Sequence, residues 1–165
     1  MAPLGPNPVP PFEVRASPIQ GQGVFATRRI RRGARLIEYT GERISHAEAD
    51  RRYDDDAVAH PHTFLFTVDA AVVIDGAVDG NAARFINHSC APNCEAVDDD
   101  GRIFIEAIRN IQPGEELVYD YQLERAGRWR KEFAERYACR CGAPDCRGVL
   151  LLKPKQPRRR PQART

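Results

Sequence analysis

The sequence lacks any apolar run that approaches the roughly 20 residues needed to cross a bilayer. Residues 1–11 contain five prolines, but they have neither the basic region nor the apolar stretch of a secretory signal. We therefore expect an intracellular protein that begins with a disordered, proline-rich leader. In that setting the five cysteines should be reduced or bound to metal rather than paired as disulfides.

Lysine is scarce, and basic charge is unevenly spread along the chain. Three of the 25 Lys and Arg residues are lysines, and six of the 25 lie in residues 153–165, where there is no acid. Removing those six leaves 19 basic against 23 acidic residues, so residues 1–152 carry a net charge of about −4. An acidic body argues against nucleic acid as the main ligand and favours a basic peptide. Direct nucleic-acid binding is expected only through the basic, disordered tail of residues 153–165.

Short runs of β-forming residues, separated by turn signals about every 8–12 residues, predict a mostly β fold with little helix. Two of the runs should form a hairpin with Asp69 near its turn, and further turns are expected at 98–101 and 113–114. The predicted strands cover residues 12–15, 36–39, 63–68, 71–74, 102–108 and 116–121.

Two helices are expected in a chain that is long enough to bury one real core. Ser45 and Glu48 form a capping box that opens a helix of about 12 residues, and Pro61 ends it. A second helix is predicted over residues 123–134, where the charged side chains are most simply a solvated face.

Three cysteines, Cys139, Cys141 and Cys146, lie within eight residues. Cysteines separated by one residue rarely suit a mutual disulfide, whereas thiolate clusters in loops suit tetrahedral zinc, which needs four ligands. Free thiols are the alternative. Only Cys90 and Cys94 remain for the fourth position, and with Cys90 the metal would hold the C-terminal segment against the central part of the chain.

The central stretch Arg84–Cys90 reads Arg-Phe-Ile-Asn-His-Ser-Cys and is followed by Pro92 and Asn93. It has too little periodicity for an ordinary strand or helix, and the Pro-Asn pair ends any regular element. Taken alone, it suits a buried loop whose polar side chains satisfy neighbouring backbone groups as well as it suits a functional site.

Several motifs occur together in the order and spacing of one family. They are Gly21-Gln-Gly-Val-Phe25, Glu38-Tyr-Thr-Gly-Glu42, Arg84-Phe-Ile-Asn-His-Ser-Cys90 and Gly114-Glu-Glu-Leu-Val-Tyr-Asp-Tyr121. With these motifs the chain resembles a SET domain, followed by a post-SET zinc segment at 139–146, and the resemblance covers about residues 13–152. It is most similar to eukaryotic-type histone lysine methyltransferases, without a cysteine-rich pre-SET segment.

The resemblance implies a SET-domain fold, which is mostly β with several small sheets and few short helices. Residues 87–90 and 117–121 would cross in a pseudoknot-like arrangement, although threaded chains are rare in proteins generally. A post-SET segment would bind structural zinc through Cys90, Cys139, Cys141 and Cys146. The implied organisation is a leader (1–11), a SET domain (12–122), a linker helix with the post-SET zinc segment (123–152) and a basic tail (153–165).

The resemblance also implies S-adenosyl-L-methionine as the methyl donor. Gln20, Gly21, Gln22 and Gly23 would approach the methionine end of this cofactor. The residues implied to hold the rest of it are Arg84, Asn87 and His88. Tyr53, on the first helix, matches a position that often contacts the cofactor, but it equally suits an ordinary amphipathic helix.

Three tyrosines match the catalytic part of the family's site. Tyr121 matches the catalytic tyrosine, and Tyr39 matches a tyrosine that lines the lysine channel. Tyr119 stands where family members carry Phe or Tyr, and a tyrosine there favours the addition of one methyl group. Each tyrosine taken singly also suits core packing with a satisfied hydroxyl group.

The expected activity is transfer of methyl groups to a lysine ε-amine in a basic protein, such as a histone or histone-like protein. The substrate strand is expected to pair with the edge of strand 63–68 and to be covered by the post-SET segment. The acidic triplets 54–56 and 98–100 are candidates for attracting the basic peptide. Such an enzyme would be nuclear or chromatin-associated in a eukaryote, and cytoplasmic or exported to a host in a bacterium. The alternatives are a catalytically idle SET module that binds basic peptides, and a zinc-ribbon nucleic-acid binder that uses the tail.

Overall fold

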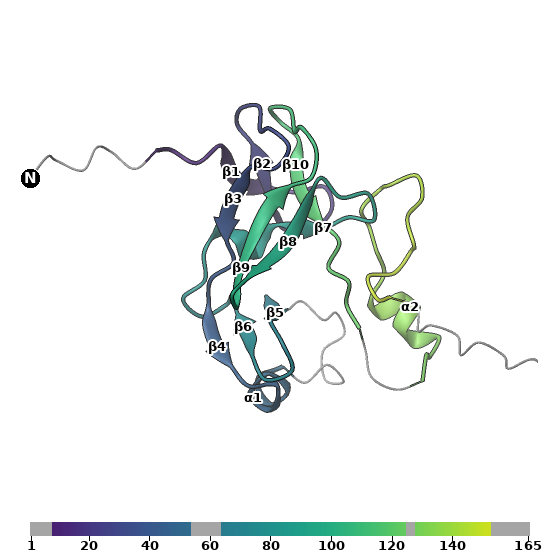
Figure 1. Cartoon of the computed structure of the whole chain (residues 1–165). Coiled ribbons are helices and arrows are strands. Elements are labelled where there is room, and N and C mark those ends of the chain that lie inside the picture. Colours follow the sequence, from purple (N-terminus) through teal and green to yellow (C-terminus); the bar gives the residue numbers. More distant parts are fainter. Residues whose placement is uncertain (1–7, 54–63, 125–127, 153–165) are drawn as a thin grey trace, which may run out of the picture.

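The computed structural model describes residues 8–53, 64–124 and 128–152, and within these residues the fold is mostly β with two short α-helices (Figure 1). None of the helices in these ranges has the length and apolar character of a membrane span. The elements are β1 (Phe12–Ala16), β2 (Gln22–Ala26), β3 (Arg35–Glu38), β4 (Glu42–Ile44), α1 (His46–Arg52), β5 (Leu65–Thr67), β6 (Val73–Asp75), the 3-10 helix η1 (Ala82–Phe85), β7 (Asn87–His88), β8 (Cys94–Asp99), β9 (Arg102–Ala107), β10 (Glu116–Tyr119) and α2 (Glu132–Arg136).

The strands form two sheets. The larger sheet has the order β1-β2-β10-β8-β9-β3, with β7 paired to β10, and the smaller sheet has the order β4-β6-β5. The predicted turns join their strands as expected: Gly101 and Asp100 have positive φ between β8 and β9, and Asp69 accepts hydrogen bonds from the N–H groups of Ala71 and Val72 between β5 and β6. The prediction of a mostly β fold is therefore confirmed.

Strand β10 joins the two halves of the larger sheet. Its Val118 and Tyr119 pair in parallel with Asn87 and His88 of β7, and Tyr119 also pairs with Cys94 of β8. The β7–β8 connection therefore closes around β10, which places the two segments predicted to cross directly against each other. This junction brings polar and aromatic residues from distant parts of the chain, such as His88 and Tyr119, to one place.

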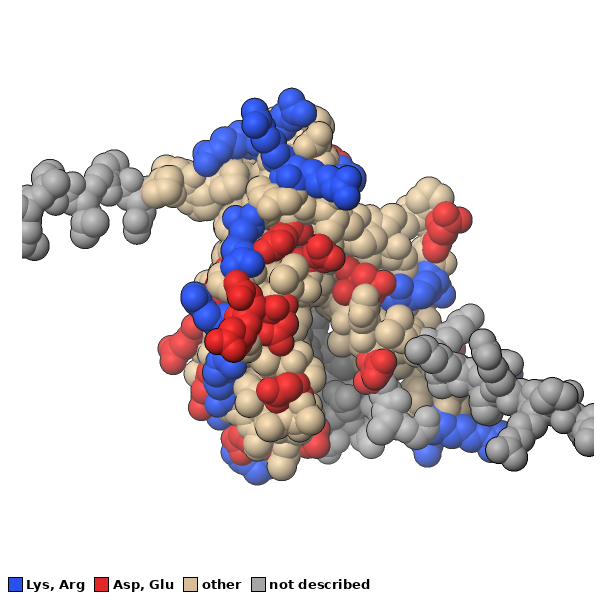
Figure 2. Space-filling model, in the orientation of Figure 1, with Lys and Arg blue, Asp and Glu red and all other residues tan. Residues whose placement is uncertain are grey.

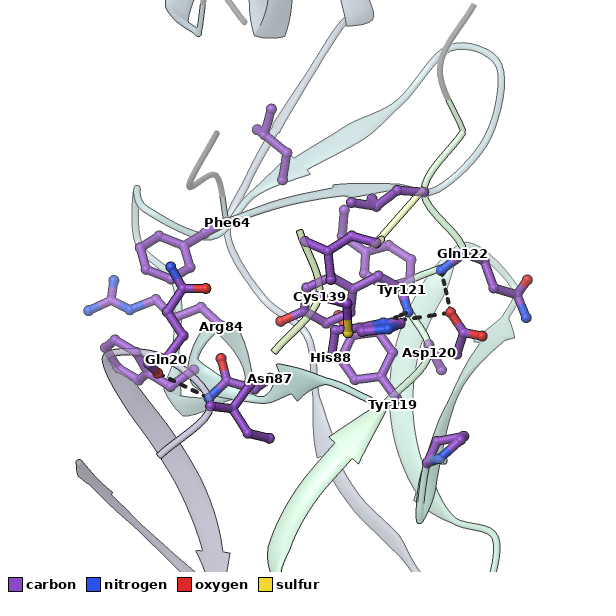
Figure 3. Close-up of a pocket in the computed structure, with 18 of the residues that line it drawn as sticks. Gln20, Phe64, Arg84, Asn87, His88, Tyr119, Asp120, Tyr121, Gln122 and Cys139 are labelled. Atoms are coloured by element: carbon purple, nitrogen blue, oxygen red, sulfur yellow. Dashed lines mark hydrogen bonds and ion pairs between the residues drawn. The ribbon is translucent and has the colours of Figure 1, made fainter. Parts of the chain in front are cut away.

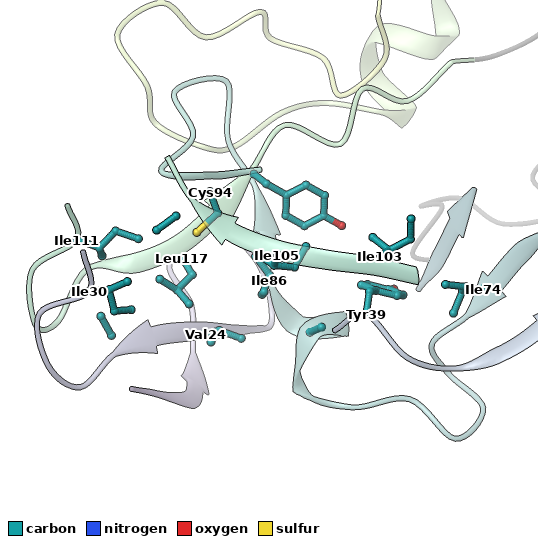
Figure 4. Packing of buried hydrophobic residues seen from close by; sticks show 14 residues of the cluster. Val24, Ile30, Tyr39, Ile74, Ile86, Cys94, Ile103, Ile105, Ile111 and Leu117 are labelled. Carbon is teal, nitrogen blue, oxygen red and sulfur yellow. The ribbon is translucent and has the colours of Figure 1, made fainter. Parts of the chain in front are cut away.

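The main core is formed largely by residues of the larger sheet and its connections (Figure 4). Ile105, Ile111 and Leu117 are 0% exposed, and the labelled side chains form a continuous apolar row. The row ends at Tyr39, beside Ile74 of the smaller sheet. Apolar burial therefore fixes the position of tyrosines that also border the candidate site.

Both helix predictions need correction in their extent. Helix α1 begins after Ser45, whose hydroxyl accepts a hydrogen bond from the Glu48 N–H at 3.1 Å, but it ends at Arg52 with Tyr53 as the C-cap. The rest of the predicted helix and Pro61 lie in 54–63, outside the described residues.

The helix predicted over 123–134 is wrong at its start, because α2 begins at Glu132. Leu123 instead forms a parallel bridge with Leu151, and its carbonyl oxygen accepts a hydrogen bond from the Leu152 N–H at 2.8 Å. Tertiary pairing has overridden local helix propensity at this position. Residues 123–152 thereby acquire a small core of their own, formed by Tyr137, Val149 and Leu151 with Leu123, Trp129, Phe133 and Leu150 packed against it.

Candidate active site

A cavity of about 1240 Å³ lies between the larger sheet, the smaller sheet and the C-terminal segment (Figure 3). Most of the residues predicted for the site line it, from elements that are far apart in sequence. One side presents Gln20, Phe64, Arg84 and Asn87, and the other presents His88, Tyr119, Asp120, Tyr121 and Cys139. Its volume exceeds the range of about 300–1,000 Å³ usual for one small-molecule pocket, so it has room for two ligand groups together.

Asn87 holds the glycine-containing segment that precedes β2. Its side-chain amide donates to the carbonyl oxygens of Gln20 at 3.2 Å and Gln22 at 2.9 Å, and to Glu116 Oε1 at 2.9 Å. Gly21 adopts φ +45° between these two carbonyls. Because a side chain rarely tolerates that conformation, the glycine permits a tight turn between the two carbonyl groups.

Glu116 fixes the same segment from the other side. Its carboxylate accepts a hydrogen bond from the Ser17 hydroxyl at 2.8 Å as well as from Asn87. A Cβ atom on Gly23 would lie 2.3 Å from Glu116 Oε1 and 2.9 Å from Ser17 Cβ, so a larger residue there would displace the Glu116 carboxylate. Gly23 does not border the cavity, and its function in the described structure is to let Glu116 approach.

The Arg84 guanidinium lies near two aromatic rings. Its Cζ is 4.7 Å from the ring centre of Phe85 and 5.7 Å from that of Phe64, and Nη1 donates to the Gly76 carbonyl oxygen at 3.2 Å. Its Nε is buried without a hydrogen-bond partner in the described protein. A cation held on aromatic faces with one unused donor can bind a polar ligand group.

Four aromatic rings form a continuous series beside the cavity. Phe66 of β5 lies 5.3 Å from Tyr39 and 6.4 Å from Tyr119, and Tyr119 lies 4.8 Å from Tyr121, measured between ring centres. Phe66 was missed as a site residue from the sequence. Its place in a predicted edge strand was the one available signal.

The three tyrosine hydroxyls have different partners. Tyr39 donates to the Phe64 carbonyl oxygen at 2.7 Å, and Tyr121 donates to the Ile86 carbonyl oxygen at 2.6 Å. The Tyr119 hydroxyl donates no hydrogen bond to any described residue. Burial raises the pKa of all three hydroxyls above the usual value of about 10, so each remains protonated at neutral pH.

His88 is a buried, neutral imidazole. Burial lowers its pKa to about 4, which outweighs the opposite effect of Asp120. Its Nδ1 accepts a hydrogen bond from the Tyr121 N–H at 3.1 Å, so the ring proton resides on Nε2, which is 3.4 Å from Cys90 Sγ. His88 therefore orients the backbone of Tyr121 and contacts the cysteine cluster at the same time.

Four thiols converge beside this site. The ligand atoms of Cys90, Cys139, Cys141 and Cys146 all lie within 4.8 Å of one another. Cys90 Sγ is 3.8 Å from Cys139 Sγ and 3.9 Å from Cys146 Sγ. Tetrahedral zinc with Zn–S bonds of about 2.3 Å requires sulfur atoms about 3.8 Å apart, so the geometry fits zinc.

Backbone N–H groups support thiolates in the cluster. Burial alone would raise the pKa of Cys141, but hydrogen bonds from the N–H groups of Cys90 and Ala143, together with the neighbouring thiols, lower it to about 6. The N–H groups of Arg147 and Gly148 also donate hydrogen bonds, to Cys90 Sγ at 3.4 Å and to Cys146 Sγ at 3.3 Å. Cys94 lies apart in the main core, so Cys90 is the fourth member of the cluster.

An ion pair ties this cluster to the tyrosine strand. Arg147, which follows Cys146, donates two hydrogen bonds to the Asp120 carboxylate, at 2.7 and 3.0 Å. Asp120 lies between Tyr119 and Tyr121 in sequence, so the ion pair connects the C-terminal segment to both. The sequence offered no signal for this pair.

Tyr53 is a predicted cofactor-binding residue that, like Gly23, does not border the cavity in the described structure. Its hydroxyl donates to the carboxylate of Asp75 at 3.0 Å, and the same carboxylate pairs with Arg52 at 3.0 Å. Asp75 is 0% exposed, and this network fixes the end of α1 against β6. The acidic triplet 54–56 and Thr63 lie outside the described residues.

Comparison with known proteins gives a consistent result. The SET domain family matches residues 21–122. The chain is 40% identical over 147 residues to a protein of Emericella nidulans, and this match covers 85% of the chain. It is 43% identical over 141 residues to a protein of Schizosaccharomyces pombe, which covers 81% of the chain. It is 42% identical over 147 residues to a protein of Saccharomyces cerevisiae, which covers 85% of the chain. Each of these relatives is named a histone-lysine N-methyltransferase, H3 lysine-4 specific. The matches cover 12%, 14% and 13% of the relatives' own lengths.

Proposed function

Since this chain belongs to the SET-domain family, we propose that it transfers methyl groups from S-adenosyl-L-methionine to the ε-amine of a lysine in a histone or histone-like protein. The observation that carries the proposal is the meeting of Tyr39, Tyr119 and Tyr121 with Asn87 in one cavity. The relatives named as H3 lysine-4 specific make histone H3 the first substrate to test.

The cofactor would occupy the side of the cavity that Gln20–Gln22, Arg84 and Asn87 form. Asn87 holds the Gln20–Gln22 backbone in place, and Arg84 offers a buried donor without a protein partner. His88, whose side chain is engaged with Tyr121 and the cysteines, would contribute its backbone groups. When bound, the cofactor supplies a methyl group on a sulfonium cation.

The aromatic rings would form the channel for the substrate lysine. Rings of Tyr39, Phe66 and Tyr119 provide an apolar wall for the aliphatic stem. The amine must be neutral to attack the methyl carbon, and a lysine of pKa about 10.4 is neutral in only about one molecule in 2,500 at pH 7. An apolar channel and a neighbouring cation both favour loss of that proton to solvent.

Tyr121 would position the amine rather than remove its proton. Because burial raises the pKa of Tyr121, its hydroxyl stays protonated, and a protonated phenol is a poor base. Its hydrogen bond to the Ile86 carbonyl oxygen fixes the ring at the end of the channel. A fixed in-line approach of the lysine nitrogen to the methyl carbon is the main catalytic contribution available from these groups.

The exposed edge of β5 would bind the substrate backbone. In the smaller sheet β5 pairs with β6 on one side, and among the described strands none pairs with its other side. An extended peptide can add to such an edge through main-chain hydrogen bonds. Strand addition there would bring a side chain of the peptide to the channel beside Phe66.

Zinc bound by Cys90, Cys139, Cys141 and Cys146 would have a structural role. It would hold residues 128–152 against the β7–β8 connection, where they complete the wall of the cavity. A closed set of four thiolates leaves no position for a substrate, which is the pattern of structural sites.

The test is incubation of the zinc-loaded chain with methyl-labelled S-adenosyl-L-methionine and a mixture of core histones and basic histone-like proteins. We expect label in one band, and sequencing of that band identifies the lysine. Cofactor binding without label on any protein in the mixture would favour the alternative, an idle SET module that binds basic peptides.

A further inference from the structure

Arginines gather at one end of the molecule, away from the cavity. We define the arginine end as the exposed residues Arg28, Arg29, Arg31 and Arg32 of the β2–β3 connection, with Arg109 of the β9–β10 connection. These two connections lie together at the top of Figure 1, and blue atoms gather there in Figure 2. Over the face below them, blue and red atoms alternate.

The backbone under the arginine end is firmly held. Ile30 is buried between the two pairs of arginines and forms an antiparallel bridge with Ile111, with both hydrogen bonds at 2.9 Å. The Arg32 N–H donates to Asn110 Oδ1 at 3.0 Å, which ties the two connections again. The guanidinium groups therefore project from a fixed platform, and less conformational entropy is lost when a ligand binds.

Most of this positive charge is uncompensated. Arg29, Arg31 and Arg32 form no ion pair with any described residue, and Arg28 donates only to the Val9 carbonyl oxygen. Glu115 is the single acid in the two connections, and it pairs with Arg109. Arginines on the face below are neutralised, for example Arg35 by Asp99 and Glu106, and Arg102 by Glu38.

We propose that the arginine end binds the phosphate backbone of double-stranded DNA. Guanidinium groups match phosphate oxygens in charge and in geometry, and several of them on one surface release several counterions on binding. The net negative charge of residues 1–152 gives no sign of this surface, because most of the acidic residues lie elsewhere. The inference depends on charge and exposure alone and does not require the proposed enzymatic function.

The composition of the surface favours duplex DNA over other polyanions. Within the described residues, neither connection exposes an aromatic or large apolar side chain. Protein interfaces use such side chains as anchors, single-stranded nucleic acid stacks on aromatic rings, and membrane surfaces require apolar insertion. Phosphate contacts to a duplex need none of these. They would also leave the β5 edge free, because β5 lies away from these connections in Figure 1, and none of the five arginines lines the cavity.

The test measures binding to a short, blunt-ended DNA duplex of mixed sequence by fluorescence anisotropy over a series of salt concentrations. The full-length parent carries Arg158→Gln, Arg159→Gln and Arg160→Gln, which removes three of the tail's six positive charges. The patch variant adds Arg29→Gln, Arg31→Gln and Arg32→Gln. The matched control instead adds Arg15→Gln, Arg51→Gln and Arg102→Gln, which removes the same charge from exposed sites elsewhere.

We expect the parent and the control to bind the duplex alike, and the patch variant to bind at least about tenfold more weakly. The slope of log affinity against log salt should fall in magnitude by about 3 in the patch variant, because each phosphate that is no longer neutralised lowers it by close to one. Equal slopes for patch variant and control would overturn the proposal, as would a parent that does not bind. Displacement of the duplex by polyglutamate at equal charge would also overturn it, in favour of an acidic protein partner. Equal thermal unfolding of the three proteins excludes misfolding as the cause.

Discussion

At the residue scale, the difference between the three tyrosine hydroxyls is central to the proposed chemistry. Tyr39 and Tyr121 each donate to a main-chain carbonyl, which fixes their rings. Tyr119 is 6% exposed and donates to no described residue. Its hydroxyl can therefore hold a water molecule in the channel, where a second methyl group on the lysine nitrogen would otherwise lie.

The first prediction concerns the product. Tyr119→Phe removes the hydroxyl and with it the water, so we expect the wild type to stop at monomethyl-lysine and the variant to add further methyl groups. The measurement is the intact mass of a histone H3 peptide over time. A variant that still stops at one methyl group, with unchanged consumption of peptide, would contradict this role for Tyr119.

The second prediction concerns pH. Burial raises the pKa of Tyr121, so its hydroxyl keeps its proton beyond the usual value near 10. The substrate lysine loses its proton as pH rises, so kcat/KM should increase from pH 7 to pH 9 and show no fall up to about pH 10. Initial rates across that range test it. A fall in rate below pH 9 in a protein that stays folded would show that an ionised tyrosine limits the reaction.

At the element scale, we expect the C-terminal segment to depend on the zinc proposed for its cysteine cluster. Among the described residues of this segment, its core has Tyr137, Val149 and Leu151 as buried apolar residues. So small a core rarely suffices for stability, and structural zinc then contributes folding free energy directly. The Arg147–Asp120 ion pair is part-exposed and adds little by comparison.

The third prediction is that a chelator unfolds this segment selectively. Trp129 is the only tryptophan of the chain and packs against the small core, so its fluorescence reports this segment alone. We expect a red shift of its emission and loss of methyl transfer on chelation, both reversed by added zinc. The far-ultraviolet circular dichroism of the larger sheet should change little. Unchanged emission after the metal has been removed would contradict the structural role.

The strands and helices also show what local sequence patterns can predict. Alternation and turn residues located β5, β6 and β9 well, because each of these strands pairs with a neighbour in sequence. No strand was predicted over β8, where only the turn that follows it was expected. The helix expected from residue 123 failed because Leu123 pairs with Leu151, a contact that no local pattern contains. The fourth cysteine remained open between Cys90 and Cys94 for the same reason.

At the scale of the whole molecule, Asn93 holds the crossing of distant segments together. Its side chain donates to the Glu116 carbonyl oxygen at 2.8 Å and accepts from the Val118 N–H at 2.9 Å, and it is 2% exposed. These two hydrogen bonds therefore hold the β7–β8 connection against β10. The motif resemblance implied this crossing. The ion pair between Asp120 and Arg147 had no sequence signal, and the only signal for Phe66 was its place in a predicted edge strand.

The fourth prediction is a large loss of stability in Asn93→Ala. The change leaves two buried main-chain groups without partners, which costs about 2–4 kcal/mol of unfolding free energy. Denaturant unfolding of the zinc-loaded chain measures it. The control is Asn110→Ala, an exposed asparagine that accepts one hydrogen bond, for which we expect less than about 1 kcal/mol. Equal losses of unfolding free energy in both variants would mean that the Asn93 side chain does not hold the two segments together.

The first question to test is whether methyl transfer to lysine takes place in this cavity. The measurement is the intact mass of a histone H3 peptide after incubation with S-adenosyl-L-methionine and one of three proteins: the wild type, Tyr121→Phe or Tyr137→Phe. Tyr137 is a matched control, because it is buried and does not border the cavity. We predict a gain of one methyl group with the wild type and Tyr137→Phe, and a rate at least about 100-fold lower with Tyr121→Phe. Equal transfer by Tyr121→Phe and the wild type would contradict the assignment of the site.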